Sequence, residues 1–186
     1  ESFTEHAIST SADAANSVYA ADVDGDGDMD VLSASWYDNK IAWYENDGSE
    51  SFTEHAISTS ADGAYSVHAA DVDGDGDLDV LSASNSDDKI AWYENDGTES
   101  FTEHTISTSA NGAKSVYAAD VDGDGDMDVL SANQSDDKIA WYENDGSESF
   151  TEHEISTLAE NTTSVHAADM DGDGDMDVLS ASWYDN

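Results

Sequence analysis

The sequence repeats itself with a period of 49 residues. The hexapeptide ESFTEH begins at residues 1, 50, 99 and 148, and the first two units differ at only eight of 49 positions. A period of about 40–50 residues built from short strands is typical of propeller blades, and no stretch shows sustained helical periodicity. The 186 residues therefore form a single repeat array of four units, the last of them incomplete: 1–49, 50–98, 99–147 and 148–186.

Each unit contains four stretches that predict β-strands. One set spans 17–23, 29–35, 40–46 and 51–59, of which the last lies at the start of the second unit and has the same sequence as 2–10 in the first. They are rich in small apolar, β-branched or aromatic residues, and Asp-Gly turn signals separate them. We expect an all-β fold, a β-propeller of four-stranded antiparallel blades. A β-sandwich is less suitable, because its strands face different environments whereas these units are nearly identical.

An acidic loop separates the first two predicted strands of every unit. The first copy places five aspartates in nine positions around Gly27, a residue that permits a sharp turn with positive φ. Alternate carboxylates can then turn toward one centre, and the residue after the glycine can add a backbone carbonyl. Such oxygen ligands suit Ca²⁺, whereas Mg²⁺ prefers a stricter octahedron and Zn²⁺ prefers nitrogen or sulfur. We predict one Ca²⁺ per unit, held by Asp22, Asp24, Asp26, Asp28, Asp30, Asp71, Asp73, Asp75, Asp77, Asp79, Asp120, Asp122, Asp124, Asp126, Asp128, Asp169, Asp171, Asp173, Asp175 and Asp177.

The overall charge supports this hypothesis and excludes some partners. The formal net charge is −40, from 44 acidic residues against four lysines. Two carboxylates about 5 Å apart repel by roughly 3 kcal/mol at an effective dielectric of about 20, so a cation would relieve each loop. No basic patch is available for nucleic acid, and no apolar run approaches the roughly 20 residues of a membrane span. Because cysteine is absent, disulfides and thiolate metal sites are excluded.

Two motifs resemble a known family. The stretches ADVDGDGDMDVLSAS at 21–35 and KIAWYENDG at 40–48 are similar to the FG-GAP/VCBS repeat, the blade of integrin-α-like β-propellers, with microbial VCBS-type repeats the better match. The resemblance covers essentially the whole chain. It implies a propeller with one Ca²⁺ loop per blade, between the first and second strands.

The units differ mainly on one predicted face. In an up-and-down blade the acidic loops and the Asn-Asp-Gly turns share one face, and the other connections share the opposite face. Differences such as WYDN at 36–39 against NSDD at 85–88 fall on that opposite face. Freely drifting loop tips would explain them, and so would a surface for a glycan or a protein partner. In the second case the candidate ligand-binding residues are Trp36, Tyr37, Trp183 and Tyr184.

Other recurring aromatic and histidine residues have a structural interpretation. We expect Trp43, Trp92 and Trp141 to pack between blades. The Glu5-His6 pair and its copies predict a solvated outer edge rather than a metal or catalytic site. A tyrosine and a histidine alternate at one position of the first strand, where packing or channel lining is expected: Tyr19, His68, Tyr117 and His166.

The sequence contains no nucleophile elbow, nucleophilic cysteine or phosphate-binding loop. We therefore expect a non-enzymatic, Ca²⁺-binding module of a secreted, extracellular or cell-surface protein, with a structural or adhesive role. The alternatives are a carbohydrate-binding, lectin-like propeller and an accessory propeller of a polysaccharide-degrading enzyme. The fourth unit lacks its third strand, so we do not expect a self-closed four-bladed ring. The array would continue in a longer chain or be completed by self-association.

Overall fold

The computed structural model describes residues 2–184, which form fourteen β-strands and one short 3₁₀ helix. The strands make three four-stranded sheets and one two-stranded sheet, with sequential neighbours paired antiparallel. The first two sheets comprise β1 (Ala15–Ala21), β2 (Asp30–Ser35), β3 (Lys40–Asn46) and β4 (Phe52–Ser58), then β5 (Ala64–Ala70), β6 (Asp79–Ser84), β7 (Lys89–Asn95) and β8 (Phe101–Ser107). The others comprise β9 (Ala113–Ala119), β10 (Asp128–Asn133), η1 (Gln134–Asp136), β11 (Lys138–Asn144) and β12 (Phe150–Ser156), then β13 (Thr162–Ala168) and β14 (Asp177–Ser182).

The predicted strands are confirmed, with two corrections. The stretch predicted at 17–23 forms β1 two residues earlier, because Val23 leaves the ladder and its N–H donates to Asp30 Oδ2 at 3.0 Å. The stretch at 2–10 is not a strand, although its copies form β4, β8 and β12. Each of those copies pairs with the third strand of its sheet, and residues 2–10 have no such partner among residues 2–184.

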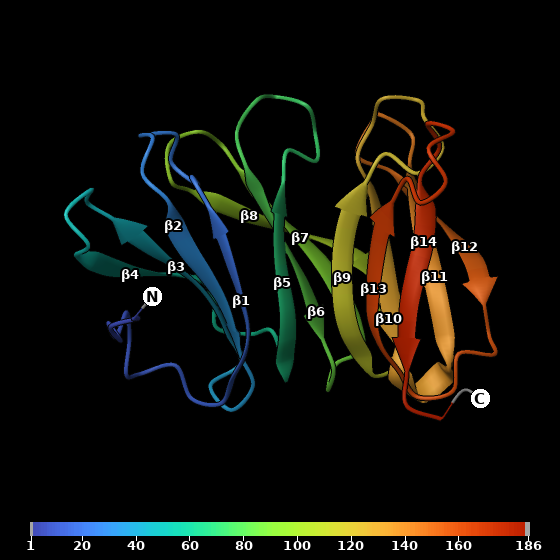
Figure 1. Ribbon diagram of the computed structural model, residues 1–186, viewed down its shortest axis with the longest axis horizontal. Coiled ribbons are helices and arrows are strands. Elements are labelled where there is room, and N and C mark those ends of the chain that lie inside the picture. Colours follow the sequence, from blue (N-terminus) through green and yellow to red (C-terminus); the bar gives the residue numbers. More distant parts are fainter. Residues whose placement is uncertain (1, 185–186) are drawn as a thin grey trace.

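The four sheets follow one another along the molecule without closing into a ring. The first strands β1, β5, β9 and β13 are neighbours in this order, and the two termini lie at opposite ends of the long axis (Figure 1). Val18 on β1 is 71% exposed. Its counterparts are each 4% exposed, because a preceding sheet covers them: Val67, Val116 and Val165. The all-β array of four-stranded antiparallel sheets is therefore confirmed, whereas the described residues do not show a closed propeller.

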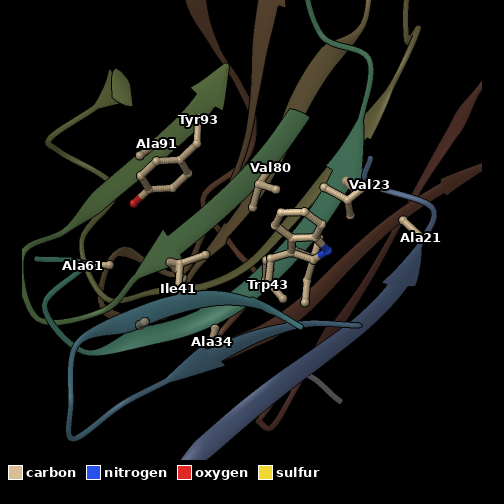
Figure 2. Packing of buried hydrophobic residues seen from close by; sticks show 13 residues of the cluster. Ala21, Val23, Ala34, Ile41, Trp43, Ala61, Val80, Ala91 and Tyr93 are labelled. Carbon is tan, nitrogen blue, oxygen red and sulfur yellow. The ribbon is translucent and has the colours of Figure 1, made fainter. Parts of the chain in front are cut away.

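The hydrophobic core lies between consecutive sheets. Trp43 on β3 is 1% exposed and packs in one cluster with Val80 on β6 and Val23 (Figure 2). The ring of Phe101, also from the second sheet, lies 6.4 Å from Trp43 between ring centroids. Burying one large apolar side chain contributes about 1.5–3 kcal/mol, so this contact fastens the sheets together. The predicted inter-blade role of this tryptophan position is confirmed.

A row of rings crosses the first strands of the four sheets. The ring centroids of Tyr19 and His68 are 4.6 Å apart, those of His68 and Tyr117 are 4.6 Å apart, and those of Tyr117 and His166 are 4.3 Å apart. Burial lowers the pKa of His68 to about 4, and the charge of His166 adds to this effect. The position therefore has the packing role that the alternation of tyrosine and histidine indicated.

Within residues 2–184, no helix is long and apolar enough to cross a membrane. The only helix described there is η1, which has three residues.

Candidate metal centre

Three aspartates of each acidic loop converge on one point. Oxygen atoms of Asp22, Asp24 and Asp30 lie within 4.8 Å of one another. The loops that carry these groups project together, as the β5–β6, β9–β10 and β13–β14 loops show at the top of Figure 1. The corresponding triads of the other units are Asp71, Asp73 and Asp79; Asp120, Asp122 and Asp128; and Asp169, Asp171 and Asp177.

Backbone amides hold the loop in this conformation. Gly27 has φ of +96° and donates its N–H to Asp22 Oδ2 at 3.0 Å. The N–H of Asp26 donates to Asp24 Oδ1 at 3.1 Å. These two bonds fold the chain back on itself, because a short aspartate side chain can bond a backbone amide a few residues later. The glycine is needed at its position, since φ in this range strains other residues.

The geometry and donor set of the triad fit a hard cation. Two oxygens on one Ca²⁺, each about 2.4 Å from the ion, can lie at most about 4.8 Å apart, and the triad oxygens fall within that limit. Oδ1 of Asp22 and Oδ1 of Asp71 are buried and have no hydrogen-bond partner within residues 2–184. A buried carboxylate oxygen without a partner is costly, and a coordinated cation would satisfy it. An all-carboxylate set favours Ca²⁺ or Mg²⁺ over Zn²⁺.

The electrostatics of the triad also favour a bound cation. Burial raises the pKa of Asp24, and the charges of Asp30, Asp26 and Asp22 raise it further. Burial also raises the pKa of Asp79 to about 6, even though the N–H groups of two neighbouring residues donate to its carboxylate. The protein therefore disfavours the fully ionised triad. A divalent cation would reverse the sign of this repulsion.

The other two aspartates of each loop lie outside the triad. Oδ1 of Asp26 accepts the N–H of Asp28 at 2.9 Å, which shapes the loop. The carboxylate of Asp28 lies beside Gly48, where φ is +72° and a Cβ would collide with that carboxylate. The acidic loop and the Asn-Asp-Gly turn therefore share one face, as the strand order predicted. The predicted ligands outside the triads are Asp26, Asp28, Asp75, Asp77, Asp124, Asp126, Asp173 and Asp175.

Asp30 also fastens the loop to the third strand of its sheet. It is fully buried, and its Oδ2 accepts the N–H of Val23 at 3.0 Å while its Oδ1 accepts the N–H of Asn46 at 2.8 Å. The same pair of bonds forms in the next two sheets. In the two-stranded fourth sheet the counterpart Asp177 is exposed. The last aspartate of the loop is therefore both a candidate ligand and a structural brace.

An asparagine that the sequence did not single out closes the loop from the next sheet. Asn95 Nδ2 donates to the carbonyl of Val23, 3.1 Å away and 72 residues earlier in the chain. Asn144 makes the corresponding bond to the carbonyl of Val72 at 3.1 Å. The only sequence signal of this role is that an asparagine recurs in the Asn-Asp-Gly turn, at residues 46, 95 and 144. Nothing local in the sequence reveals a partner so far away.

The opposite face carries the candidate ligand-binding aromatics. Trp36 donates its backbone N–H to the carbonyl of Ala14 at 3.0 Å, so the variable loops meet there. The rings of Trp36 and Tyr65 lie 5.7 Å apart at 82°, beside a depression of about 300 Å³ that Tyr37 also lines. The remaining two candidates, Trp183 and Tyr184, are exposed near the C-terminal end of the described chain.

These features define a class of repeat protein, in which each four-stranded antiparallel blade carries an acidic loop between its first two strands. The family model described as the FG-GAP-like repeat matches residues 22–82, 71–131 and 120–180. The chain therefore belongs to the FG-GAP-like repeat family, as its motifs indicated. No curated protein sequence matches the chain.

Solved structures with the same fold include a lectin, an enzyme and a biofilm matrix protein. An Agrocybe aegerita lectin that recognises non-reducing terminal N-acetylglucosamine has a TM-score of 0.61 and 18% identity over 88% of this chain and 46% of its own. A catalytically inactive virginiamycin B lyase from Staphylococcus aureus, with quinupristin, has a TM-score of 0.56 and 16% identity. The match covers 84% of this chain and 46% of the lyase chain. The V. cholerae biofilm matrix protein Bap1 has a TM-score of 0.52 and 23% identity, over 88% of this chain and 27% of the Bap1 chain. This chain thus spans less than half the length of these structures, and the likeness establishes the fold alone.

Proposed function

We propose that the chain is a Ca²⁺-stabilised, non-enzymatic repeat module of an extracellular or cell-surface protein, with a structural or adhesive role. The observation that carries this proposal is the recurrence of the aspartate triad at matching positions in all four units. The bound ion would supply positive charge to a loop that otherwise repels itself. The chain's own groups then fix the loop between strands and against the next sheet, through bonds such as those of Asp30 and Asn95.

The expected stabilisation is large on the scale of a small domain. A site at tenfold excess of Ca²⁺ over its Kd stabilises the folded state by about 1.4 kcal/mol, so four independent sites would contribute roughly 6 kcal/mol. The net stability of a typical domain is about 5–15 kcal/mol. Ca²⁺ modules outside cells often bind in the range of about 0.1–1 mM, which agrees with a module that folds fully where the ion is abundant.

The outer histidines support a structural rather than a catalytic interpretation. Nε2 of His55 lies 2.8 Å from Oε2 of Glu45, and its ring stacks on Trp43 at 4.7 Å. The same arrangement recurs in the next two sheets. A histidine that contacts a glutamate and stacks on a tryptophan of the third strand braces the edge of each four-stranded sheet.

The test is a melting curve with Ca²⁺ and with excess chelator, together with the Ca²⁺ stoichiometry by calorimetry. We expect about four ions per chain and a melting temperature roughly 10–20 °C lower in chelator, from the linkage above and the usual dependence for domains of this size. Equal melting temperatures in the two buffers would overturn the proposal.

A second candidate function is carbohydrate binding by the variable face. The depression beside Trp36, Tyr37 and Tyr65 favours it, because aromatic faces and a concave surface suit sugar rings. The fold that the chain shares with a lectin supports the same candidate.

A further inference from the structure

The depression beside Trp36 is lined mostly by residues that differ between the repeat units. Six residues line it: Ala14, Asn16, Trp36, Tyr37, Tyr65 and Lys114. The first five stand at positions where the first two units differ, and these two units differ at only eight of 49 positions. Lys114 is the third-unit counterpart of Asn16 and Tyr65. Drifting loop tips would explain the differences themselves, and what indicates a local role is that the differing residues meet around one depression.

The depression also holds an unusual cation. Lys114 has no carboxylate partner within residues 2–184, although the chain has 44 acidic residues. Its Nζ lies instead 3.7 Å from the ring centroid of Tyr65 and 5.3 Å from that of Trp36. The other three lysines are paired with glutamate, at 2.6, 2.7 and 2.6 Å: Lys40 with Glu54, Lys89 with Glu103 and Lys138 with Glu152.

The surroundings of Lys114 favour an anionic ligand. Lys114 is half-buried, and this burial lowers the pKa of its ammonium group. Aromatic rings attract the cation but do not neutralise it, and a carboxylate would add charge-assisted hydrogen bonds. Because the chain carries a formal charge of −40, a singly charged group is a better partner than a dense polyanion. Tyr37, 74% exposed, offers a flat apolar face beside this cation.

We propose that this depression binds one carboxylated sugar ring, a terminal hexuronate residue of a glycan, through Lys114, Asn16 and the exposed face of Tyr37. Lys114 and Asn16 donate hydrogen bonds to the carboxylate, and the tyrosine packs against the C–H face of the sugar. The volume of about 300 Å³ is at the lower end for small-molecule sites, which suits a single ring. This inference specifies the ligand class of the carbohydrate-binding candidate and does not depend on the metal assignment.

The test is calorimetry on the full chain in saturating Ca²⁺. The probes are disaccharides ending in glucuronate or galacturonate, the matching neutral glucose and galactose disaccharides, and a short glutamate-rich peptide. We expect at least one uronate to bind at least tenfold more tightly than its neutral partner. K114Q should weaken uronate binding at least tenfold, because it removes the charge, whereas K114R should stay within a few-fold of the parent chain.

The repeat itself provides matched variants. Lys114→Thr and Tyr65→Asn install the residues found at the same position in the fourth and first units, Thr163 and Asn16, so the fold already accepts them. Both should weaken binding without changing the melting temperature in Ca²⁺. Leu158→Ser changes a residue that is 82% exposed to the serine that the other three units carry at this position, and it should leave binding unchanged.

Three results would overturn the inference. They are no uronate binding at millimolar concentration, binding that K114Q leaves intact, and glutamate-peptide binding as tight as that of the uronate, which would assign the site to a protein partner. Loss of the chelator effect on melting would instead refute the Ca²⁺ proposal, and the sugar titration would still report on this site.

Discussion

The side-chain amide of Asn95 donates to the backbone carbonyl of Val23 at 3.1 Å, from the end of β7 in the second sheet to the acidic loop of the first. Asn95 is 2% exposed. Within residues 2–184 no acidic loop comes before the first sheet, and Asn46, the counterpart of Asn95, donates there to Met29, within its own sheet. The candidate metal loop of one sheet is therefore completed by the sheet that follows it.

Changing this asparagine should destabilise the array. Asn95→Ala leaves the carbonyl of Val23 without its donor and should lower the free energy of unfolding by about 1–3 kcal/mol, the usual cost of a buried unsatisfied group. Asn46→Ala is the matched control, because both asparagines accept the N–H of the glycine two residues later at 3.2 Å. Urea unfolding in Ca²⁺ measures the difference. Equal losses in the two variants would contradict an inter-sheet role.

The triad predicts which aspartates bind the ion. Asp71→Asn removes a triad carboxylate whose Oδ1 is buried without a partner, and it should reduce the Ca²⁺ stoichiometry by about one ion per chain. Asp77→Asn lies outside the triad and should keep the full stoichiometry. Calorimetric titration of both variants checks this. Loss of an ion in both would mean that the loop rearranges to use all five aspartates.

The Asn-Asp-Gly turn predicts a requirement for glycine. In Gly97→Ala the new Cβ would collide with the carboxylate of Asp77, at a φ of +71°. Gly74→Ala faces open space at a φ of +75°, so it carries the backbone strain alone. That strain costs about 1–2 kcal/mol, and Gly97→Ala should lose more than Gly74→Ala. Thermal unfolding compares the two, and a smaller loss for Gly97→Ala would argue against the packing of the loop on the turn.

The buried histidine predicts an acid-dependent loss of stability. Burial lowers the pKa of His68 from 6.5 to about 4, so the unfolded chain binds the proton more readily than the folded chain. The contribution of His68 is therefore complete above pH 6.5 and is lost as the pH falls toward 4, by up to about 3 kcal/mol.

A tyrosine at this position removes the effect. His68→Tyr restores the residue that the neighbouring sheets carry, Tyr19 and Tyr117, and should flatten the stability profile between pH 6.5 and 4 relative to the parent chain. The raised pKa of Asp79 acts in the opposite direction, but it is common to both proteins and cancels in the comparison. His166→Tyr changes the exposed end of the row and removes only the smaller charge effect on His68, so it should change the profile much less than His68→Tyr does. Parallel profiles for the parent and His68→Tyr would refute the assignment.

Local pattern was sufficient for much of the fold. The spacing of apolar residues and Asp-Gly turns located the strands, because a strand and its turn are determined by nearby residues. The strand prediction was wrong at 2–10. The sequence there is the same as at 51–59, where β4 forms, but a strand also needs a neighbouring strand to pair with. The prediction also extended β1 to Val23, whose N–H a side chain accepts instead of the partner strand.

The sequence predicted the kind of candidate metal site, but not which aspartates of each loop come together. Alternate spacing identified the aspartates that can turn inward, and the structure brings three of five together. Whether Asp26 and Asp28 join them depends on the local bond between these two residues and on the nearby turn. The meeting of Trp36, Tyr65 and Lys114 joins residues from three sheets. A contact of that kind depends on how sheets stack, which no single repeat encodes.

The asparagine bond gives the array a polarity. The loops of the first two sheets each accept this bond from the sheet that follows them, so damage to one sheet removes the bond from its predecessor's loop and not from its own. In a lengthened array of such sheets, ion release would begin at the C-terminal boundary and move backward, one loop at a time.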